Sequence, residues 1–200
     1  ILGVAGASAN NSIILLSGVA GLLAGAFSMA AGEYVSVRSQ REMFEHQIGL
    51  ERDELAQYPE EEAEELALIY AARGLPREDA QKLAKALIAD PAKALDTLAR
   101  EELGLNPEDL GSPWGVAIFS FLSFAAGALV PLLPFLALSG ERALPVSIVF
   151  TALTLFTVGA VISLFTGRSA LRDGLRMLTI GATAGALTYT IGKLLGVSLT

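Results

Sequence analysis

The chain has no cysteine and only one histidine among its 200 residues. Without cysteine, no disulfide, thiolate zinc site or redox dithiol can form. Charged residues make up 18% of the chain, whereas an average soluble domain has about 25%. Hydrophobic residues make up 52%, and the mean hydropathy is +0.53. These values exclude a soluble globular class.

Sequence motifs of enzymes are also missing. The chain contains no phosphate-binding loop and no nucleophile elbow. The single histidine, His46, stands in a charged segment, and we interpret it as a solvated surface residue rather than a ligand. The calculated pI is about 4.8 and there is no basic cluster, so nucleic acid is not an expected partner. We therefore expect neither an enzyme nor a nucleic-acid-binding protein.

The charges that are present are confined to one part of the chain. Residues 33–109 hold 19 of the 21 acidic and 9 of the 14 basic residues. Three runs carry no charge at all, namely 1–32, 110–140 and 143–167. Each is longer than the roughly 20 residues that cross a bilayer core. The pattern predicts a membrane protein with an acidic insert.

We expect an all-α, polytopic membrane helix bundle of the five-helix type with an inserted helical domain. Ile1–Ala7 has neither a Met nor a basic n-region, so it is not a signal peptide and we expect it to be the end of a truncated first membrane helix. Pro131 and Pro134 predict a kink or a break in the third span. The remaining spans are predicted at about 13–37, 113–138, 143–166 and 174–195. The predicted domains are 1–37, 38–109 and 110–200.

Arginines in the connecting segments predict the orientation. Arg38 and Arg41 follow the second span, and three arginines (168, 172 and 176) lie between the fourth and the fifth. Because such residues favour the cytoplasmic side, we expect residues 38–109 to be cytoplasmic. The compact, Ala- and Leu-rich sequence without organelle-targeting residues suggests a bacterial inner (plasma) membrane.

The insert is predicted to be helical throughout. Nothing breaks the pattern between Val37 and Tyr58, so we expect the second span to continue as one long helix. Proline favours the first position of a helix, and glycine follows the last. Further helices are therefore predicted from Pro59 to Gly74, from Pro76 to about Ala89 and from Pro91 to about Leu103.

Carboxylates dominate the chemistry of the insert. Glu51 and Glu54 are three residues apart on one predicted helix, and Glu62 and Glu65 on the next, so each pair shares a helix face. If the two helices were antiparallel neighbours, the four acids would converge, and Glu101 and Glu102 could complete a ring. Oxygen ligands favour hard or borderline divalent cations. The same pattern is typical of an amphipathic helix that exposes its acids to water, and both interpretations stay open.

A second candidate lies in the membrane. Met29 and Glu33 are four residues apart and share one face of the second span. An acid beside a thioether inside a membrane is typical of an ion path, and iron(II) and manganese(II) tolerate this mixed ligation. Alternatively, Glu33 lies at the membrane interface and Met29 only packs against a neighbouring helix.

Four stretches carry a resemblance to a known family. They are GLLAGAFSMAAGEYVSVRSQRE (21–42), ELALIYAARGL (65–75), EELGL (101–105) and GLRMLTIGATAGALTYTIGKLLG (174–196). Their order, their spacing and the position of the insert resemble the vacuolar iron transporter family over essentially the whole chain. The resemblance implies a homodimeric, proton-coupled exporter of iron(II) and manganese(II) with five membrane helices and a cytoplasmic metal-binding insert.

The resemblance also implies site residues. The positions that match the family's metal-binding glutamates are Glu51, Glu54, Glu62, Glu65 and Glu102, and Met29 and Glu33 match its ion path. No organic cofactor is implied; the bound or transported ions would be iron(II), manganese(II) and also zinc(II).

The chain departs from the family at two places. The Asp-Gly motif of the family's first helix would precede Ile1, and a methionine ligand of some inserts aligns near Leu98, which cannot coordinate a metal. A non-transporting membrane anchor with a metal-sensing insert, fused to an upstream domain, is the alternative function. An Asp-Gly upstream of Ile1 would favour transport over this alternative.

Overall fold

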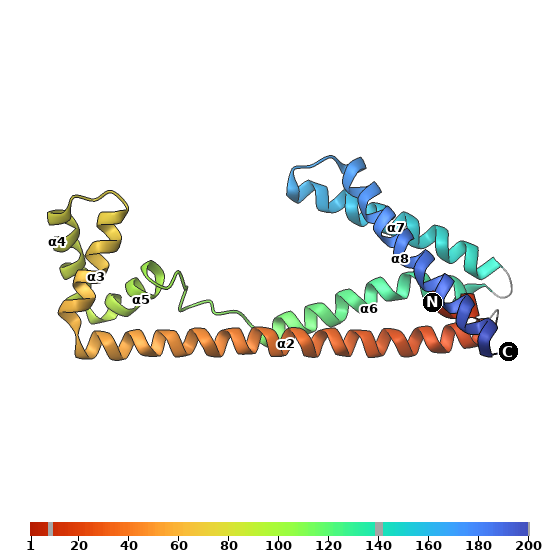
Figure 1. The fold of residues 1–200 in the computed structure, drawn as a ribbon, viewed down its shortest axis with the longest axis horizontal. Coiled ribbons are helices and arrows are strands. Elements are labelled where there is room, and N and C mark those ends of the chain that lie inside the picture. Colours follow the sequence, from red (N-terminus) through yellow and green to blue (C-terminus); the bar gives the residue numbers. More distant parts are fainter. Residues whose placement is uncertain (8–9, 139–141, 200) are drawn as a thin grey trace. The chain divides into compact units, whose positions relative to one another are not determined.

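The computed structural model describes residues 1–7, 10–138 and 142–199, and within these ranges it contains helices and no strand (Figure 1). The predicted all-α class is confirmed. In chain order the helices are α1 (Leu2–Ala7), α2 (Asn11–Gln57), α3 (Pro59–Ala72), α4 (Arg77–Ile88), α5 (Pro91–Glu101), α6 (Pro113–Ala137), α7 (Ala143–Thr166) and α8 (Ala170–Leu199).

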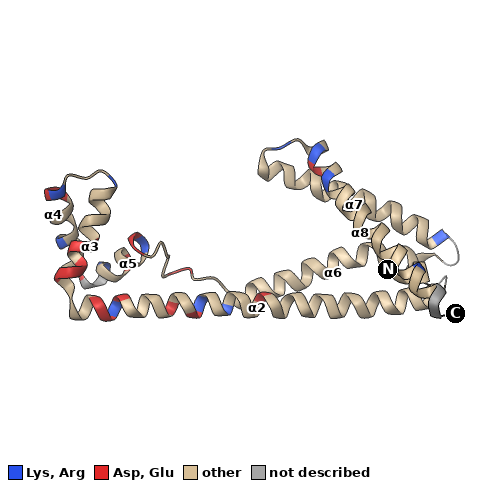
Figure 2. Ribbon diagram, viewed as in Figure 1, with Lys and Arg blue, Asp and Glu red and all other residues tan. Residues whose placement is uncertain are grey.

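The chain forms two compact units. The first comprises Ile1–Ala30 and Ile118–Thr200, and the second comprises Ala31–Ala117. The second unit is a single stretch of sequence and the first is made of the two stretches that flank it. Most of the acidic and basic side chains lie on the α2–α5 part of the chain, as Figure 2 shows.

The first unit is built from apolar helices. Among the described residues, α2, α6 and α7 are long and apolar enough to cross a membrane. The last predicted span, 174–195, lies within α8, which packs against α7 and α1. Ile14, Phe135 and Ala143 form a small buried cluster in this unit. Leucines, valines and phenylalanines elsewhere on these helices are exposed, as expected for surfaces that face lipid.

Glycines allow the helices of the first unit to approach closely. A Cβ atom added to Gly192 of α8 would collide with the carbonyl oxygen of Gly3 in α1. A Cβ at Gly159 of α7 would lie 2.5 Å from the carbonyl oxygen of Asp173 in α8. Backbone contacts this close require glycine and are typical of packed membrane helices.

Helix α6 is not broken at its two prolines. The helix runs from Pro113 to Ala137 with Pro131 and Pro134 inside it. Proline lacks an N–H and displaces nearby carbonyls, so helices of this kind need other donors. Ser147 of α7 supplies one, because its hydroxyl donates to the carbonyl oxygen of Pro131 at 2.7 Å and the side chain is almost fully buried.

Helices α3, α4 and α5 of the second unit begin and end within two residues of the predicted positions. Helix α2 continues to Gln57, and Pro59 is the first residue of α3. Gly74 follows α3 with a φ of 101°, a left-handed conformation that glycine adopts without strain. A buried apolar cluster joins α3, α4 and α5, and its members are Leu66, Ala67, Ala80, Ala84 and Leu98.

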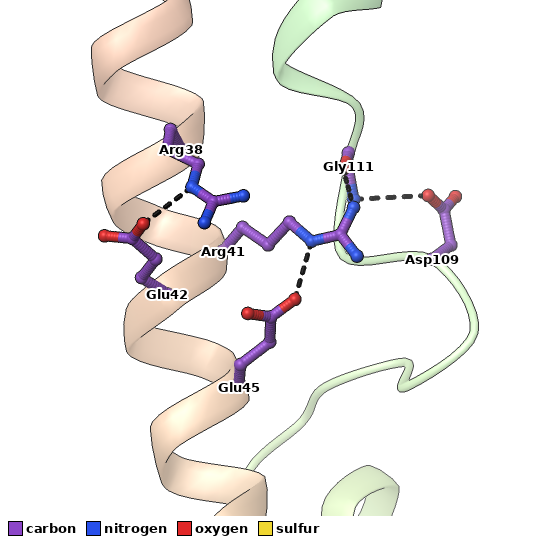
Figure 3. Close-up of polar contacts among 6 residues, drawn as sticks. All are labelled: Arg38, Arg41, Glu42, Glu45, Asp109 and Gly111. Carbon is purple, nitrogen blue, oxygen red and sulfur yellow. Dashed lines mark hydrogen bonds and ion pairs between the residues drawn. The ribbon is translucent and has the colours of Figure 1, made fainter.

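The segment that leaves α5 returns to α2. In Figure 3, Arg41 of α2 donates from Nε to Glu45 at 2.7 Å and from Nη1 to the carbonyl oxygen of Gly111 at 3.4 Å. Farther along, the rings of Tyr34 and Trp114 lie with their centroids 4.9 Å apart. The start of α6 is thus attached to α2 by polar and aromatic contacts.

Candidate metal site

Three glutamates meet where three helices end or begin. Glu51 lies near the C-terminal end of α2, Glu62 in the first turn of α3, and Glu102 directly after the last residue of α5. One carboxylate oxygen of each lies within 4.8 Å of the others. The arrangement places up to three negative charges in one small volume.

Helix α3 does not run back alongside α2 as the sequence interpretation assumed. It turns away from the axis of α2 after Gln57 (Figure 1). The acids therefore converge at the corner between the two helices rather than along a shared antiparallel face. This geometry selects one acid from each i,i+3 pair, because Glu51 and Glu62 are buried while Glu54 and Glu65 are exposed.

The buried glutamates have no protein partner for part of their carboxylate. Glu51 and Glu62 are each 6% exposed, and the Oε2 atom of each is buried without a hydrogen-bond donor. A buried and unpaired carboxylate is costly unless it is protonated or bound to a cation. The site therefore has an unmet requirement that a proton or a metal ion can satisfy.

Burial and mutual repulsion raise the pKa values in the cluster. Burial raises the pKa of Glu51 to about 7, and the charges of Glu102, Glu54 and Glu65 add to this effect. Burial likewise raises the pKa of Glu62 to about 7, with the charge of Glu51 next in importance. Burial and the neighbouring acids also raise the pKa of Glu102. Each of these shifts favours the protonated form of the carboxyl group.

The two adjacent glutamates at the end of α5 have different neighbours. The expectation that Glu101 joins the acidic ring is wrong, because its carboxylate forms an ion pair with Arg73, which directly follows α3. Consecutive helical positions point about 100° apart, so only one of the two can face the corner. Glu102 is the one that does so.

Sequence reasoning missed Arg73 and Tyr70. The Tyr70 hydroxyl of α3 donates to Glu101 Oε1 at 3.5 Å, so Tyr70 and Arg73 both contact the end of α5. Burial raises the pKa of Tyr70, and the nearby charge of Glu101 raises it further. The partner of Arg73 is 28 positions away in the chain, and no local pattern identifies it.

The other residues identified from the sequence lie outside the acidic cluster. Leu98, the position that aligns near a methionine ligand, is fully buried in the apolar cluster. His46 is exposed, as expected. Met29 and Glu33 both lie on α2, with Met29 exposed and Glu33 partly buried.

Taken together, the apolar helices and the acidic corner define an all-α membrane protein with a carboxylate cluster suited to a divalent cation. Comparisons with known proteins identify its family. The model of the VIT family matches residues 1–193. The chain is 33% identical over 192 residues to vacuolar iron transporter 1 of Arabidopsis thaliana, covering 96% of this chain and 77% of the relative.

Two further relatives agree. The vacuolar iron transporter of Acanthamoeba castellanii is 37% identical over 193 residues, covering 94% of this chain and 72% of the relative. The vacuolar iron transporter 1 of Oryza sativa subsp. japonica is 32% identical over 192 residues, covering 96% and 76%. The chain belongs to the VIT family, a family of metal-ion transporters rather than enzymes.

Proposed function

We propose that the protein exports iron(II) and manganese(II) from the cytoplasm across a membrane in exchange for protons. In this proposal residues 38–109 form a cytoplasmic domain that captures the metal. The observation that carries the proposal is the cluster of Glu51, Glu62 and Glu102, in which Glu51 and Glu62 each have one buried carboxylate oxygen without a donor. The names of the relatives, which specify vacuolar iron transport, support iron as a substrate.

Glu54 and Glu65 complete the proposed metal site from its exposed side. Their charges contribute to the raised pKa values of Glu51 and Glu62, so both lie close to the cluster. Five carboxylates around this corner can hold one divalent ion or a few such ions. Such a set binds iron(II), manganese(II) or zinc(II) with little selectivity among them.

Proton exchange follows from the chemistry of the same carboxylates. A metal ion displaces protons from Glu51 and Glu62, and protons that return favour release of the ion. Because the pKa values of both groups are raised to about 7, this exchange takes place near neutral pH. Met29 and Glu33 are proposed to receive the ion farther along α2, where a soft and a hard ligand are four residues apart.

We further propose a homodimer in an inner (plasma) membrane, with α8 as a membrane span beside α7 and α1. The exposed apolar faces of the described helices support a partner or lipid on these surfaces. No organic cofactor takes part in the proposed cycle.

Metal flux in vesicles tests the function. The protein, reconstituted in lipid vesicles, is expected to move iron(II) or manganese(II) when a proton gradient is imposed, and to move neither when the gradient is collapsed. The Glu51→Ala, Glu65→Ala double variant is expected to bind the metal more weakly by calorimetry. Equal flux with and without the gradient would contradict proton coupling. Unchanged affinity of the double variant would contradict the metal site.

A further inference from the structure

Arg73, which directly follows α3, contacts the end of α5 beside the acidic cluster. Glu101, the last residue of α5, is bound by Arg73, while Glu102, the next residue, faces Glu51 and Glu62. We propose that Arg73 is a positioning residue that orients Glu102 as a metal ligand, with Tyr70 assisting it. This inference rests on the proposed function of the cluster.

The contacts of Arg73 hold both the side chain and the backbone of Glu101. Its Nη1 atom forms an ion pair with Glu101 Oε2, and its Nη2 atom donates to the Glu101 carbonyl oxygen at 3.3 Å. The Tyr70 hydroxyl reaches the second carboxylate oxygen at 3.5 Å. A planar guanidinium that makes two contacts of this kind restrains rotation as well as distance.

Arg73 is itself well anchored. It follows the last residue of α3, and its backbone N–H donates to the carbonyl oxygen of Ile69 at 3.2 Å. Helix α3 is held in the apolar cluster through the buried side chains of Leu66 and Ala67. The restraint on α5 therefore comes from the same helix that carries Glu62.

The backbone N–H of Glu102 donates to the carbonyl oxygen of Leu98 at 2.9 Å, but no hydrogen bond among the described residues orients its carboxylate. The Oε2 atoms of Glu51 and Glu62 have no donor, and the like charges of the cluster repel Glu102 before a cation arrives. The last turn of a helix also frays readily, because its carbonyl groups lack partners within the helix. By binding the Glu101 carbonyl and carboxylate, Arg73 opposes both effects.

Replacing Arg73 distinguishes a positioning role from a purely electrostatic one, because the two predict opposite changes in metal affinity. Removal of a positive charge near a cation site strengthens cation binding if only electrostatics matter. The positioning role predicts the opposite result, because a ligand that is no longer oriented binds more weakly. Outer partners that orient metal ligands typically contribute about 10–100-fold to affinity.

The test measures manganese(II) binding to the full chain in detergent by isothermal titration calorimetry. We expect Arg73→Gln to weaken the affinity about tenfold or more. Arg73→Lys should fall between Arg73→Gln and the wild type, since an ammonium restores the charge but makes fewer contacts. The exchanged pair Arg73→Glu, Glu101→Arg should recover much of the loss. Arg100→Gln is the matched control, because it removes the same charge from an exposed ion pair of α5, Asp96–Arg100.

The outcomes distinguish this role from a general effect on folding and from the proposed function. Helical content and thermal unfolding of each metal-free variant are measured beside its affinity. The positioning role is overturned if Arg73→Gln binds manganese(II) as tightly as the wild type or more tightly, if Arg100→Gln weakens binding equally, or if affinity is lost only in proportion to helical content. If the wild type binds no manganese(II), the proposed function fails and the positioning role fails with it.

Discussion

Glu51 and Glu62 are 94% removed from solvent as residues, yet each leaves one carboxylate oxygen without a donor. Such groups destabilise a fold when they are charged and alone. Two residues that harm stability in the metal-free state and lie beside a third acid are typical of a site that keeps its ligands ready for a cation.

Replacing either buried glutamate with glutamine should stabilise the metal-free protein and weaken its binding of manganese(II). We expect Glu51→Gln and Glu62→Gln to raise the unfolding temperature of the metal-free protein, because a neutral amide removes the charge repulsion. Both should weaken manganese(II) affinity by about tenfold or more, since each removes an anionic ligand. Thermal unfolding and calorimetry measure the two effects. Glu64→Gln is the control, because Glu64 is exposed on the same helix.

Metal affinity should rise with pH up to slightly above neutrality. The pKa values of Glu51 and Glu62 are raised to about 7, so both carboxyls are largely protonated below this pH and must release protons to bind a metal. Below about pH 7 we expect affinity to fall up to tenfold per pH unit for each displaced proton. Calorimetry in buffers of different ionisation enthalpy counts these protons. An affinity independent of pH from about 6 to 8 would show that these carboxyls are not the ligands.

The same shifts affect the stability of the metal-free protein. Because the folded pKa values lie above the unfolded value of 4.5, the folded state binds more protons between about pH 4.5 and pH 7. Stability from these two groups is therefore greatest at the acidic end of this window. It decreases as the pH rises through 7, and a bound cation would remove the decrease.

At the scale of elements, α2 carries residues of both proposed sites, the acidic cluster and the ion path. Its 47 residues run from Asn11 to Gln57 without a break and include Met29, Glu33 and Glu51. Met29 and Glu33 are distant from Glu51 along the chain, so the two proposed sites share no residue and can be tested separately.

Loss of the two ligands of the proposed path should stop transport but leave capture unchanged. We expect Met29→Ala and Glu33→Gln to reduce iron(II) flux in vesicles with a proton gradient, since they remove a soft ligand and a proton acceptor. Calorimetric binding of manganese(II) by the acidic cluster should equal that of the wild type. Wild-type flux in both variants would assign the path to other residues.

Ser28→Ala is a suitable control for the flux measurement. Ser28 is exposed on α2 next to Met29 and points to a different side of the helix. We expect this variant to transport at the wild-type rate.

At the scale of the whole molecule, the absence of cysteine makes the orientation testable. A cysteine placed at Glu64 in α3 should react with a membrane-impermeant thiol reagent from the cytoplasmic side only. A cysteine placed at Arg142, which precedes α7, should react from the opposite side only. Both residues are exposed, so labelling reports the side of the membrane on which each residue lies rather than its burial in the protein. Reaction of both from one side would contradict the proposed orientation.

The proposed homodimer can be tested with the same cysteine-free protein. We expect the mass of the detergent-solubilised protein, measured by light scattering, to correspond to two chains after subtraction of detergent. The physical reason is that a bundle with many exposed apolar faces can bury further surface against a second copy. A monomer alone at micromolar concentration would contradict this expectation.

Much of the architecture is determined by the sequence alone, because it depends on local physics. Charge-free apolar runs predict α6 and α7 nearly to the residue, and Pro59 and Gly74 mark the ends of α3. These signals work because a bilayer excludes charge, proline lacks an N–H and glycine tolerates a positive φ. The acidic composition of the insert, by contrast, leaves a cation site and a solvated helix face both open.

The selection among the acids is decided only by the tertiary structure. From spacing, Glu51 and Glu54 are equivalent, as are Glu101 and Glu102. The turn between α2 and α3 buries Glu51 and Glu62, and Arg73 draws Glu101 out of the cluster. Burial and a partner 28 positions away depend on how helices pack, and packing is set by contacts between residues that are distant in sequence. Local periodicity carries no information about those contacts.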